Sequence, residues 1–547
     1  MKSIKIQGLA ILISFLSMAA IQAQSLETTV DQLLSQKYAS GDPGATALIA
    51  KNGKVIYRKA FGAANLELDI PMKPENVFEL GSITKQFTSV SILMLMEQGK
   101  LSLQDDITKF IPDYPTHDKK ISVHNLLNHT SGIKSYTAMP TFREMARTDM
   151  SPTELIDVFK NEPMDFDPGE KYAYNNSAYI ILGHIIEVVS EMSYADFVEK
   201  HIFKELGMKN SYYGSMSKVI KNRANGYQPT EDGFRNADYL SLTLPYAAGS
   251  LMSCVDDMLL WSQAIHNNTL ISEKSKQLAF TNGKLNDGSL IYYGYGFSVN
   301  EINGVPTIEH GGGIFGYETY GAYVPSENVY VIVLTNRNGN GPSDVAVEMA
   351  ALAIGKPFPS NTSVSISEDK MKQWVGAYEF DNGVIRYITM QEGRLYSQRE
   401  GSENLALNTV SENEFYFEES FTSYKFSKEN GKKVAIFKSR IKEVKGLESD
   451  KKPPAAKESI TLDANILEKY IGKYEIQPGF EIEITIDGNQ LFATPTGQGK
   501  AELFAENKTT FFLKVVQAQV IFNVDENGVA QSLTLNQGGQ QMEGKKV

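Results

Sequence analysis

The last third of the chain contains one segment twice, and this repeat restricts the fold more than any other sequence feature. Residues 375–379 (VGAYE) recur 96 residues later as residues 471–475 (IGKYE). The same offset relates four further apolar or aromatic pairs: Leu395 and Leu491, Tyr396 and Phe492, Phe415 and Phe511, and Phe426 and Phe522. Each copy consists of short alternating segments with turn signals, and it is long enough for roughly eight short strands. The repeat therefore predicts two small all-β, barrel-like domains, at residues 369–450 and 463–547.

The region before the repeats, residues 24–356, has a mixed pattern. Two strand-like segments flank Asn52-Gly53, which is a strong hairpin signal, and strand patterns return between residues 295 and 334. Residues 81–268 between them are mainly helical. We therefore expect an α/β (α+β) domain, in which both ends of the region build one antiparallel sheet around a helical insert.

The first 23 residues have the build of a secretory signal peptide. Lys2 and Lys5 precede an apolar stretch from Leu9 to Ile21, and Ala23 offers a cleavage site. An uncleaved membrane anchor is the alternative, but the apolar core is short for a span of about 20 residues. We expect cleavage after Ala23, no membrane span afterwards, and a periplasmic or secreted protein.

Charge and cysteine content restrict the partners and sites that this chain can have. The formal net charge is −12, which repels phosphate backbones, so we expect no nucleic-acid partner. Cys254 is the single cysteine, so the chain forms no internal disulfide, and we expect no cysteine-based metal site. The position of Cys254 beside a predicted helix start favours a buried, inert thiol over a catalytic one.

Ser82 and Lys85 form the strongest chemical signal, within residues 79–85 (ELGSITK). Gly81 and the apolar run after Ser82 predict that Ser82 opens a helix, in which residues three apart project to the same side. A serine becomes a good nucleophile when a base takes its proton, and a lysine can be that base when burial or nearby positive charge destabilises its ammonium form. By itself this spacing is also common on surface helices.

Residues 167–177 (DPGEKYAYNNS) form a turn that leads into a predicted helix at Ala178. Tyr174 and Asn176 lie two apart, so both can face one cleft. A tyrosine near ammonium groups can act as an acid or a base, and an asparagine amide can hold a substrate carbonyl and a lysine. The alternative is an ordinary helix start, in which Asn176 or Ser177 is the cap and the tyrosines only pack.

Residues 309–317 (EHGGGIFGY) combine His310 with a run of glycines. Glycines at an edge strand let a substrate backbone approach closely, and His310 can exchange hydrogen bonds with a substrate. The alternative is a glycine-rich turn between strands with a satisfied histidine.

Together, these segments resemble the serine β-lactamase and penicillin-binding-protein superfamily, in its class C branch. Residues 82–85 (SITK) match the Ser-x-x-Lys motif, residues 174–176 (YNN) look like the class C Tyr-x-Asn motif, and residues 310–312 (HGG) look like a divergent Lys-Thr-Gly motif. The resemblance covers about residues 26–354. The two repeats resemble lipocalin-like modules that follow such hydrolases.

The resemblance implies a mechanism. Ser82 would attack a carbonyl group and form an acyl-enzyme, while Lys85 and Tyr174 share the proton transfers. The backbone N–H groups of Ser82 and Gly313 would form the oxyanion hole. The substrate-binding residues would be Asn176, His310 and Gly312. The resemblance implies a small-molecule or peptide substrate and neither a metal nor an organic cofactor. It leaves open whether the protein forms a homo-oligomer.

Residues 310 and 311 depart from the class C pattern, in which Lys and Thr supply a cation and a hydroxyl for the substrate carboxylate. His310 is largely neutral near pH 7 unless its surroundings shift it, and Gly311 has no hydroxyl. The resemblance therefore favours an exported serine hydrolase of amide or ester bonds, similar to a D-amino-acid peptidase, carboxypeptidase or esterase. The alternatives are a penicillin-binding-like sensor or ligand-binding protein with little turnover, and a weak β-lactamase.

Overall fold

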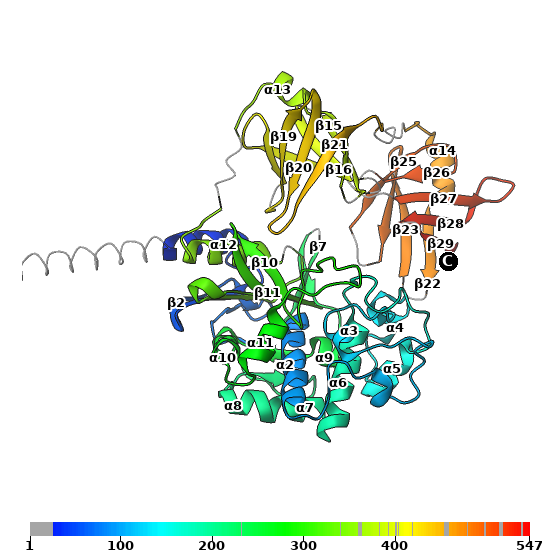
Figure 1. The fold of residues 1–547 in the computed structure, drawn as a ribbon. Coiled ribbons are helices and arrows are strands. Elements are labelled where there is room, and N and C mark those ends of the chain that lie inside the picture. The colour runs from blue at the N-terminus through cyan, green and yellow to red at the C-terminus, as the bar shows by residue number, and fades with distance from the viewer. Residues whose placement is uncertain are drawn as a thin grey trace, which may run out of the picture. The chain divides into compact units, whose positions relative to one another are not determined.

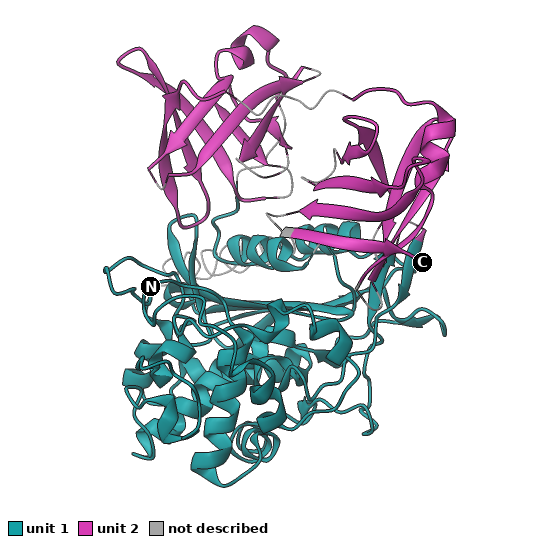
Figure 2. Ribbon diagram, turned by 90° about the vertical axis from the view of Figure 1, so that its right-hand side faces the viewer, with its two compact units in different colours: residues 1–229, 233–358 teal, residues 230–232, 359–547 magenta. Residues whose placement is uncertain are grey.

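The computed structural model describes residues 26–547 apart from short gaps, and the chain divides into two compact units (Figure 2). The gaps are residues 231, 340, 359–363, 382, 392, 400–401, 403, 418–419, 453–458, 478–479, 497–498, 514–517 and 538–539. The first unit contains the described residues up to 358 except 230–232, and the second unit contains the remainder. The predicted signal peptide, residues 1–23, lies outside the described residues.

The first unit contains an antiparallel sheet of six strands in the order β10-β11-β12-β13-β1-β2. A turn at Asn52 and Gly53, both with positive φ, joins the first two strands. Because β1 pairs with β13, the two ends of the region meet in one sheet, as the sequence predicts. The strands are β1 (Ala45–Lys51), β2 (Lys54–Phe61), β10 (Ser298–Ile302), β11 (Val305–Ile314), β12 (Tyr317–Val324) and β13 (Val329–Thr335).

Helices cover both faces of this sheet (Figures 1 and 2). α12 (Ser343–Ala353) packs on β12 and β13, whereas α10 (Val255–His266) packs on the other face against β13 and β1. The helical insert lies on the same side as α10. Its further helices include α2 (Thr84–Glu97), α3 (Val123–Leu127), α5 (Pro152–Phe159), α6 (Asn176–Ser190), α7 (Tyr194–Val198) and α9 (Tyr246–Gly249), and α11 (Glu273–Phe280) follows the insert.

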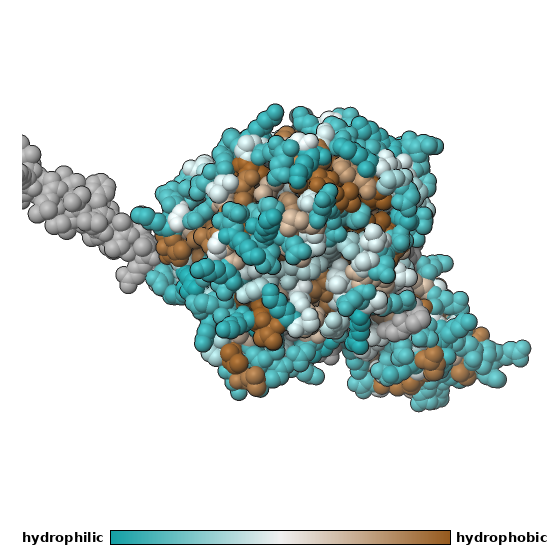
Figure 3. Space-filling model, turned by 90° about the horizontal axis from the view of Figure 1, so that it is seen from below, coloured by the Kyte–Doolittle hydropathy of each residue, from teal (hydrophilic) through white to brown (hydrophobic). Residues whose placement is uncertain are grey.

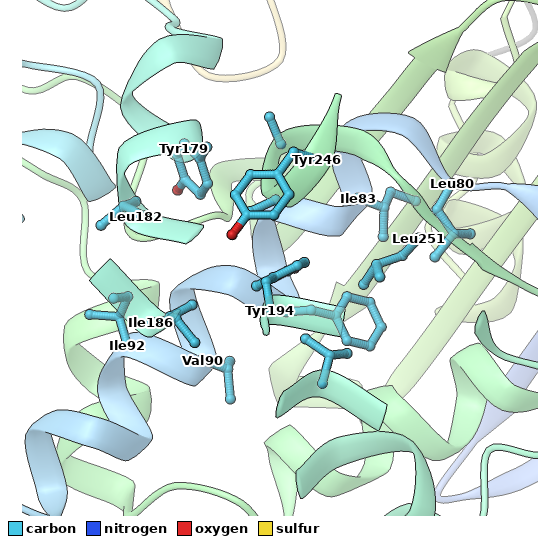
Figure 4. Packing of buried hydrophobic residues seen from close by; sticks show 14 of the residues in the cluster. Leu80, Ile83, Val90, Ile92, Tyr179, Leu182, Ile186, Tyr194, Tyr246 and Leu251 are labelled. Atoms are coloured by element: carbon cyan, nitrogen blue, oxygen red, sulfur yellow. The ribbon is translucent and has the colours of Figure 1, made fainter. Parts of the chain in front are cut away.

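α2 is the buried centre of the insert. Every residue from Thr84 to Leu93 is buried, and apolar side chains of α2 and α6 pack against each other (Figure 4). The buried hydroxyl groups of α2 are paired: Thr88 Oγ1 donates to the Ala247 carbonyl oxygen at 2.6 Å, and Ser89 Oγ lies 3.0 Å from the Tyr179 hydroxyl. A helix enclosed on all sides needs such small or apolar residues all round. This enclosure is what places the side chain of Lys85 in the interior.

The second unit contains two closed barrels of eight antiparallel strands, which confirms the two barrel-like modules that the repeat predicts. The first barrel is formed by β14 (Gly376–Phe380), β15 (Ile385–Gln391), β16 (Arg394–Arg399), β17 (Asn404–Thr409), β18 (Glu414–Phe417), β19 (Ser423–Glu429), β20 (Lys432–Lys438) and β21 (Glu443–Ser449). The second is formed by β22 (Gly472–Gln477), β23 (Phe480–Asp487), β24 (Gln490–Pro495), β25 (Ala501–Ala505), β26 (Thr510–Phe512), β27 (Ala518–Val524), β28 (Ala530–Gln537) and β29 (Gln540–Lys546).

Each barrel has its own apolar interior, and the 96-residue offset relates their internal contacts. The Tyr378 hydroxyl donates to the Trp374 carbonyl oxygen at 2.7 Å, and the Tyr474 hydroxyl donates to the Tyr470 carbonyl oxygen at the same distance. Both tyrosines are fully buried within the clusters that fill the two barrels. The repeat therefore preserves a buried polar contact as well as the strand pattern.

Cys254 is buried at the N-terminal cap position of α10. Burial raises the pKa of its thiol to about 11, so little thiolate forms at neutral pH. These observations confirm the predicted buried, unreactive cysteine.

The search for membrane-crossing helices covered the described residues, and none of them forms a helix with the necessary length and apolar character. Figure 3 shows a face on which hydrophilic side chains occupy most of the area, with apolar patches scattered among them.

We expect Tyr378→Phe to lower the free energy of unfolding of the first barrel by about 1–3 kcal/mol, because the Trp374 carbonyl loses its buried donor. Trp374 stacks on Phe426 inside this barrel, and a Trp261→Phe background leaves it as the single tryptophan. Urea unfolding of the full chain, followed by Trp374 fluorescence, measures the change. The control Tyr396→Phe, at a half-buried position on β16, should change the free energy of unfolding by less than about 0.5 kcal/mol. Equal losses in both variants would contradict this assignment.

Candidate active site

Ser82 lies where the chain enters the central helix. After β5 (Phe78–Glu79) the chain turns through a short 3-10 helix, Gly81–Ile83, directly into α2. Gly81 adopts φ +53°, and a Cβ at this position would lie 2.9 Å from the backbone nitrogen of Gly313. Both the backbone conformation and the close approach require glycine. The turn thus brings Ser82 next to the strand that carries the third sequence motif.

Lys85 is fully buried one helical turn beyond Ser82. Its Nζ lies 3.1 Å from Ser82 Oγ, 2.8 Å from Asn176 Oδ1 and 2.9 Å from the carbonyl oxygen of Ala248. The predicted Ser-x-x-Lys spacing therefore corresponds to a direct contact between the two functional groups, and two distant segments hold the amine in place.

These three contacts fit an uncharged amine. The carbonyl oxygens of Asn176 and Ala248 can only accept, so they take the two N–H groups of a neutral amine. The lone pair of Nζ is then left to accept from the Ser82 hydroxyl. Burial lowers the pKa of Lys85 well below its ordinary value, which favours the same protonation state. Lys85 is arranged as a base for Ser82.

The Tyr174 phenol is near enough to the Ser82 hydroxyl to interact with it, and Lys85 Nζ lies 4.8 Å from the centre of the Tyr174 ring. Although 40% of the residue is exposed, the protein atoms around the phenol desolvate it and raise its pKa above the ordinary value. Tyr174 is therefore a neutral phenol that can pass a proton between Ser82 and a bound group.

Asn176 is free to bind Lys85 because its neighbour caps the helix. Asn175 Oδ1 accepts from the Ala178 backbone N–H at 2.9 Å, and the Asn175 backbone N–H donates to His129 Nδ1 at 3.1 Å. The cap of α6 is thus Asn175, rather than the alternative caps Asn176 or Ser177. Asn176 Nδ2 donates to Thr137 Oγ1 at 2.9 Å, which fixes the orientation of the amide whose oxygen contacts Lys85.

His129 supports this segment from behind. It is fully buried, its carbonyl oxygen accepts from the Ala173 backbone N–H at 3.0 Å, and its ring lies 4.3 Å from the Tyr174 ring. Burial lowers the pKa of His129 well below its ordinary value, so the imidazole is neutral. The carbonyl of His129 contacts the backbone before Tyr174 and its imidazole contacts the backbone after it, so His129 holds the turn.

The glycine run is part of β11, not a turn. β10 pairs only with Val305–Glu309, so in the described residues β11 beyond this point has β12 as its strand partner. A Cβ at Gly312 would lie 2.0 Å from the Leu80 carbonyl oxygen, whereas a Cβ at Gly313 would meet nothing within 4 Å. The strand therefore presses against the turn before Ser82 and keeps an open edge at Gly313.

His310 has both ring nitrogens engaged. Nδ1 lies 2.5 Å from the Gly311 carbonyl oxygen, so the hydrogen-bond pattern places the ring proton there, and Nε2 then accepts from the Tyr293 hydroxyl at 2.9 Å. Burial lowers the pKa of His310 to about 4. His310 is 5% exposed and neutral at physiological pH.

A cavity of about 490 Å³ opens beside Ser82. Ser82, Asn176, Ala248 and Gly313 form its reactive side, and Phe315 contributes to the opposite wall. Among the described residues, no group of three or more His, Cys, Asp or Glu side chains is placed to hold a metal ion.

The structure brings the predicted residues together: Lys85 contacts Ser82 and Asn176, and the Tyr174 ring lies 4.8 Å from Lys85 Nζ. The third motif touches the same turn through Gly312 and Gly313. The sequence interpretation missed the contributions of the Ala248 carbonyl, Thr137 and Tyr293. The run of small residues at 247–249 is the one local signal that indicates such a close backbone approach.

Comparisons with known proteins show the family of the first unit and relatives of the chain. Residues 30–356 match the family model described as Beta-lactamase, and residues 456–546 match a domain of unknown function, DUF3471. A penicillin-binding protein of Bacillus subtilis (strain 168) is 29% identical over 394 residues, which cover 68% of this chain and 87% of that protein. Protein flp of Staphylococcus aureus (strain MW2) is 28% identical over 329 residues, which cover 58% of this chain and 63% of that protein.

Solved structures show the same fold. The octameric penicillin-binding protein homologue from Pyrococcus abyssi has a TM-score of 0.56 and 27% identity, and the match covers 77% of this chain and 99% of that one. A D-stereospecific amidohydrolase from Streptomyces has a TM-score of 0.50 and 25% identity, with 61% and 98% of the two chains covered. Because the Beta-lactamase model spans more than half of the chain, this protein belongs to the beta-lactamase family of serine hydrolases.

Proposed function

We propose that this protein is an exported serine hydrolase that cleaves amide or ester bonds through an acyl-enzyme on Ser82. The observation that carries this proposal is the buried Lys85 amine, whose Nζ lies within hydrogen-bond distance of two carbonyl oxygens and of the Ser82 hydroxyl. A simple binding site has no need for a desolvated amine in contact with a hydroxyl group. Such an arrangement serves to activate a nucleophile.

In the acylation step, Ser82 Oγ attacks the substrate carbonyl carbon while its proton passes to Lys85. The carbonyl oxygen becomes an oxyanion, which the backbone N–H groups of Ser82 and Gly313 stabilise. The proton then moves through the Tyr174 hydroxyl to the leaving nitrogen or oxygen as its bond to the carbonyl carbon breaks. The result is an ester between Ser82 and the acyl group, and a neutral amine or alcohol departs.

In the deacylation step, water attacks the same carbonyl carbon and gives a proton to the Lys85–Tyr174 pair. The bond between the carbonyl carbon and Ser82 Oγ breaks, Ser82 recovers its proton, and a carboxylic acid is released. Asn176 contributes by binding the substrate carbonyl or amide and by keeping Lys85 in place.

The third motif favours substrates that do not depend on a free carboxylate. His310 is neutral, and its two ring nitrogens are engaged by Gly311 and Tyr293. It therefore offers no cation to a carboxylate, unlike the lysine of the class C pattern. An amidase or esterase activity fits this site better than a β-lactamase activity, and the likeness to a D-stereospecific amidohydrolase supports that choice.

Export rests on the predicted signal peptide, and a homo-oligomer is consistent with the octameric description of the archaeal homologue. Neither property enters the chemistry proposed for Ser82.

A serine-reactive fluorophosphonate should add once to the wild-type protein and not to Ser82→Ala, because only an activated serine displaces the fluoride. Intact-mass measurement of the mature protein detects the adduct. Absence of an adduct on both proteins would overturn the mechanism. With p-nitrophenyl acetate, continued release of p-nitrophenol beyond one equivalent supports a hydrolase, whereas one equivalent and a stable acyl adduct would indicate the penicillin-binding-like sensor.

The pH dependence of kcat/KM should follow the protonation of Lys85. The neutral amine is the active form, so activity is present above its pKa and declines as the pH falls through it, with a slope of one proton. Because burial depresses this pKa, the decline should occur well below the ordinary lysine value of about 10.4. Lys85→Met should lower kcat/KM by about 10²–10⁴-fold. If the residual kcat/KM of Lys85→Met declined at the same low pH as that of the wild type, Lys85 would not be the group whose protonation causes the decline.

Tyr174→Phe removes the proton donor but keeps the ring. We expect about a 10²-fold lower kcat/KM for a p-nitroanilide, whose leaving nitrogen must gain a proton. The matched p-nitrophenyl ester should lose much less, since p-nitrophenolate leaves without one. Comparing the two substrates on both proteins tests the role, and an equal loss on both would show that Tyr174 does not protonate the leaving group.

A further inference from the structure

The cavity beside Ser82 is neutral as well as large. None of the described residues that line it carries a charge; its polar groups are hydroxyls and the side-chain amides of Asn176, Gln228 and Asn338. Its apolar walls are formed by Tyr136, Phe142, Leu240, Ile314 and Phe315. A dry cavity of about 150 Å³ already admits a benzene-sized ring, so about 490 Å³ has room for a bulky group.

The position of this cavity identifies the part of the substrate that it receives. Ser82 and Gly313, which supply the proposed oxyanion hole, line the cavity together with Asn176. Tyr174 and His310 do not line it. Because the leaving group has to face the Tyr174 hydroxyl that protonates it, the cavity lies on the other side of the scissile bond and faces the acyl group.

The walls are held by contacts that do not depend on a ligand. The Tyr136 hydroxyl donates to the Leu244 carbonyl oxygen at 2.7 Å, and the Tyr136 and Phe142 rings meet edge to face at 5.7 Å. Asn338 holds the β11–β12 turn that carries Phe315, since its Nδ2 donates to the Ile314 carbonyl oxygen at 2.8 Å and its Oδ1 accepts from the Gly316 backbone N–H at 2.6 Å. The aromatic surface is therefore pre-formed, which lowers the entropy lost on binding.

We propose that this cavity is the acyl-binding site and that it selects substrates with a bulky, uncharged, apolar or aromatic acyl group. A carboxylate or ammonium group on the acyl side would lose its hydration without gaining an opposite charge from the lining residues. This inference rests on the proposed function, because it assigns the substrate class of the same Ser82 centre.

Gln228 provides a place to test the role of charge. Its side chain lines the cavity, and no described residue donates a hydrogen bond to its Oε1. Replacing the amide oxygen therefore leaves no neighbouring donor without an acceptor. Gln228→Arg adds a cation to the wall, and Gln228→Met is the matched neutral variant of similar length.

The experiment uses p-nitrophenyl esters that differ only in the acyl group: acetyl, phenylacetyl and 4-carboxyphenylacetyl. The rate of release of the first equivalent of p-nitrophenol reports acylation even where turnover is slow. For wild type, phenylacetyl should react at least about tenfold faster than acetyl, and 4-carboxyphenylacetyl at least about tenfold slower than phenylacetyl. Phe315→Ala should lower the phenylacetyl-to-acetyl ratio by about tenfold.

Gln228→Arg should raise the rate with 4-carboxyphenylacetyl by about tenfold relative to Gln228→Met, while the two variants react alike with phenylacetyl. Equal rates across the acyl series, or no difference between these variants, would overturn the inference.

Fluorophosphonate labelling of Ser82 in each protein separates the two proposals. If Ser82 is labelled but the three esters acylate it at equal rates, only the assignment of the acyl-binding site is overturned. If the wild-type protein is neither labelled nor acylated, the proposed function is overturned as well.

Discussion

The chemistry of this protein depends on one interaction, the burial of the Lys85 amine against two carbonyl oxygens and the Ser82 hydroxyl. An ammonium ion at this place would need a compensating negative charge, and its contacts are neutral oxygens. Desolvation therefore favours the uncharged amine. The hydrogen-bond geometry then leaves a single lone pair, directed at Ser82. Stability and the proposed reactivity have the same origin here, because the enclosure that packs α2 also desolvates its lysine.

The second requirement is a close approach of two backbone segments. Gly81 turns into the 3-10 helix with a left-handed φ and lies against Gly313, while Gly312 lies against Leu80. Side chains at these glycines would separate β11 from the start of α2. Because β10 ends its pairing at Glu309, the strand beyond it keeps an open edge next to Ser82. A substrate backbone can extend along that edge, and the glycine run predicted such a close approach from the sequence.

Much of the fold could be predicted because the relevant signals are local. The 96-residue repeat and its strand alternation predicted two barrels, and the Asn52-Gly53 hairpin together with the late strands predicted a sheet built from both ends. The helix start at Ser82 was also a local signal. By contrast, the sequence left open whether Asn176 caps α6 or faces the site. The structure gives the cap to Asn175, whose backbone N–H also donates to His129 from a distant segment.

The sequence by itself determined the residue types and their order: the Ser82–Lys85 pair on one helix, the Tyr174–Asn176 turn, and a histidine, His310, in place of a lysine. The tertiary structure decided their protonation and exposure. The Ala248 carbonyl that helps to keep Lys85 uncharged is 163 residues away, and the Tyr293 hydroxyl occupies a ring nitrogen of His310. Desolvation and hydrogen-bond partners come from such distant segments, so no local pattern contains them.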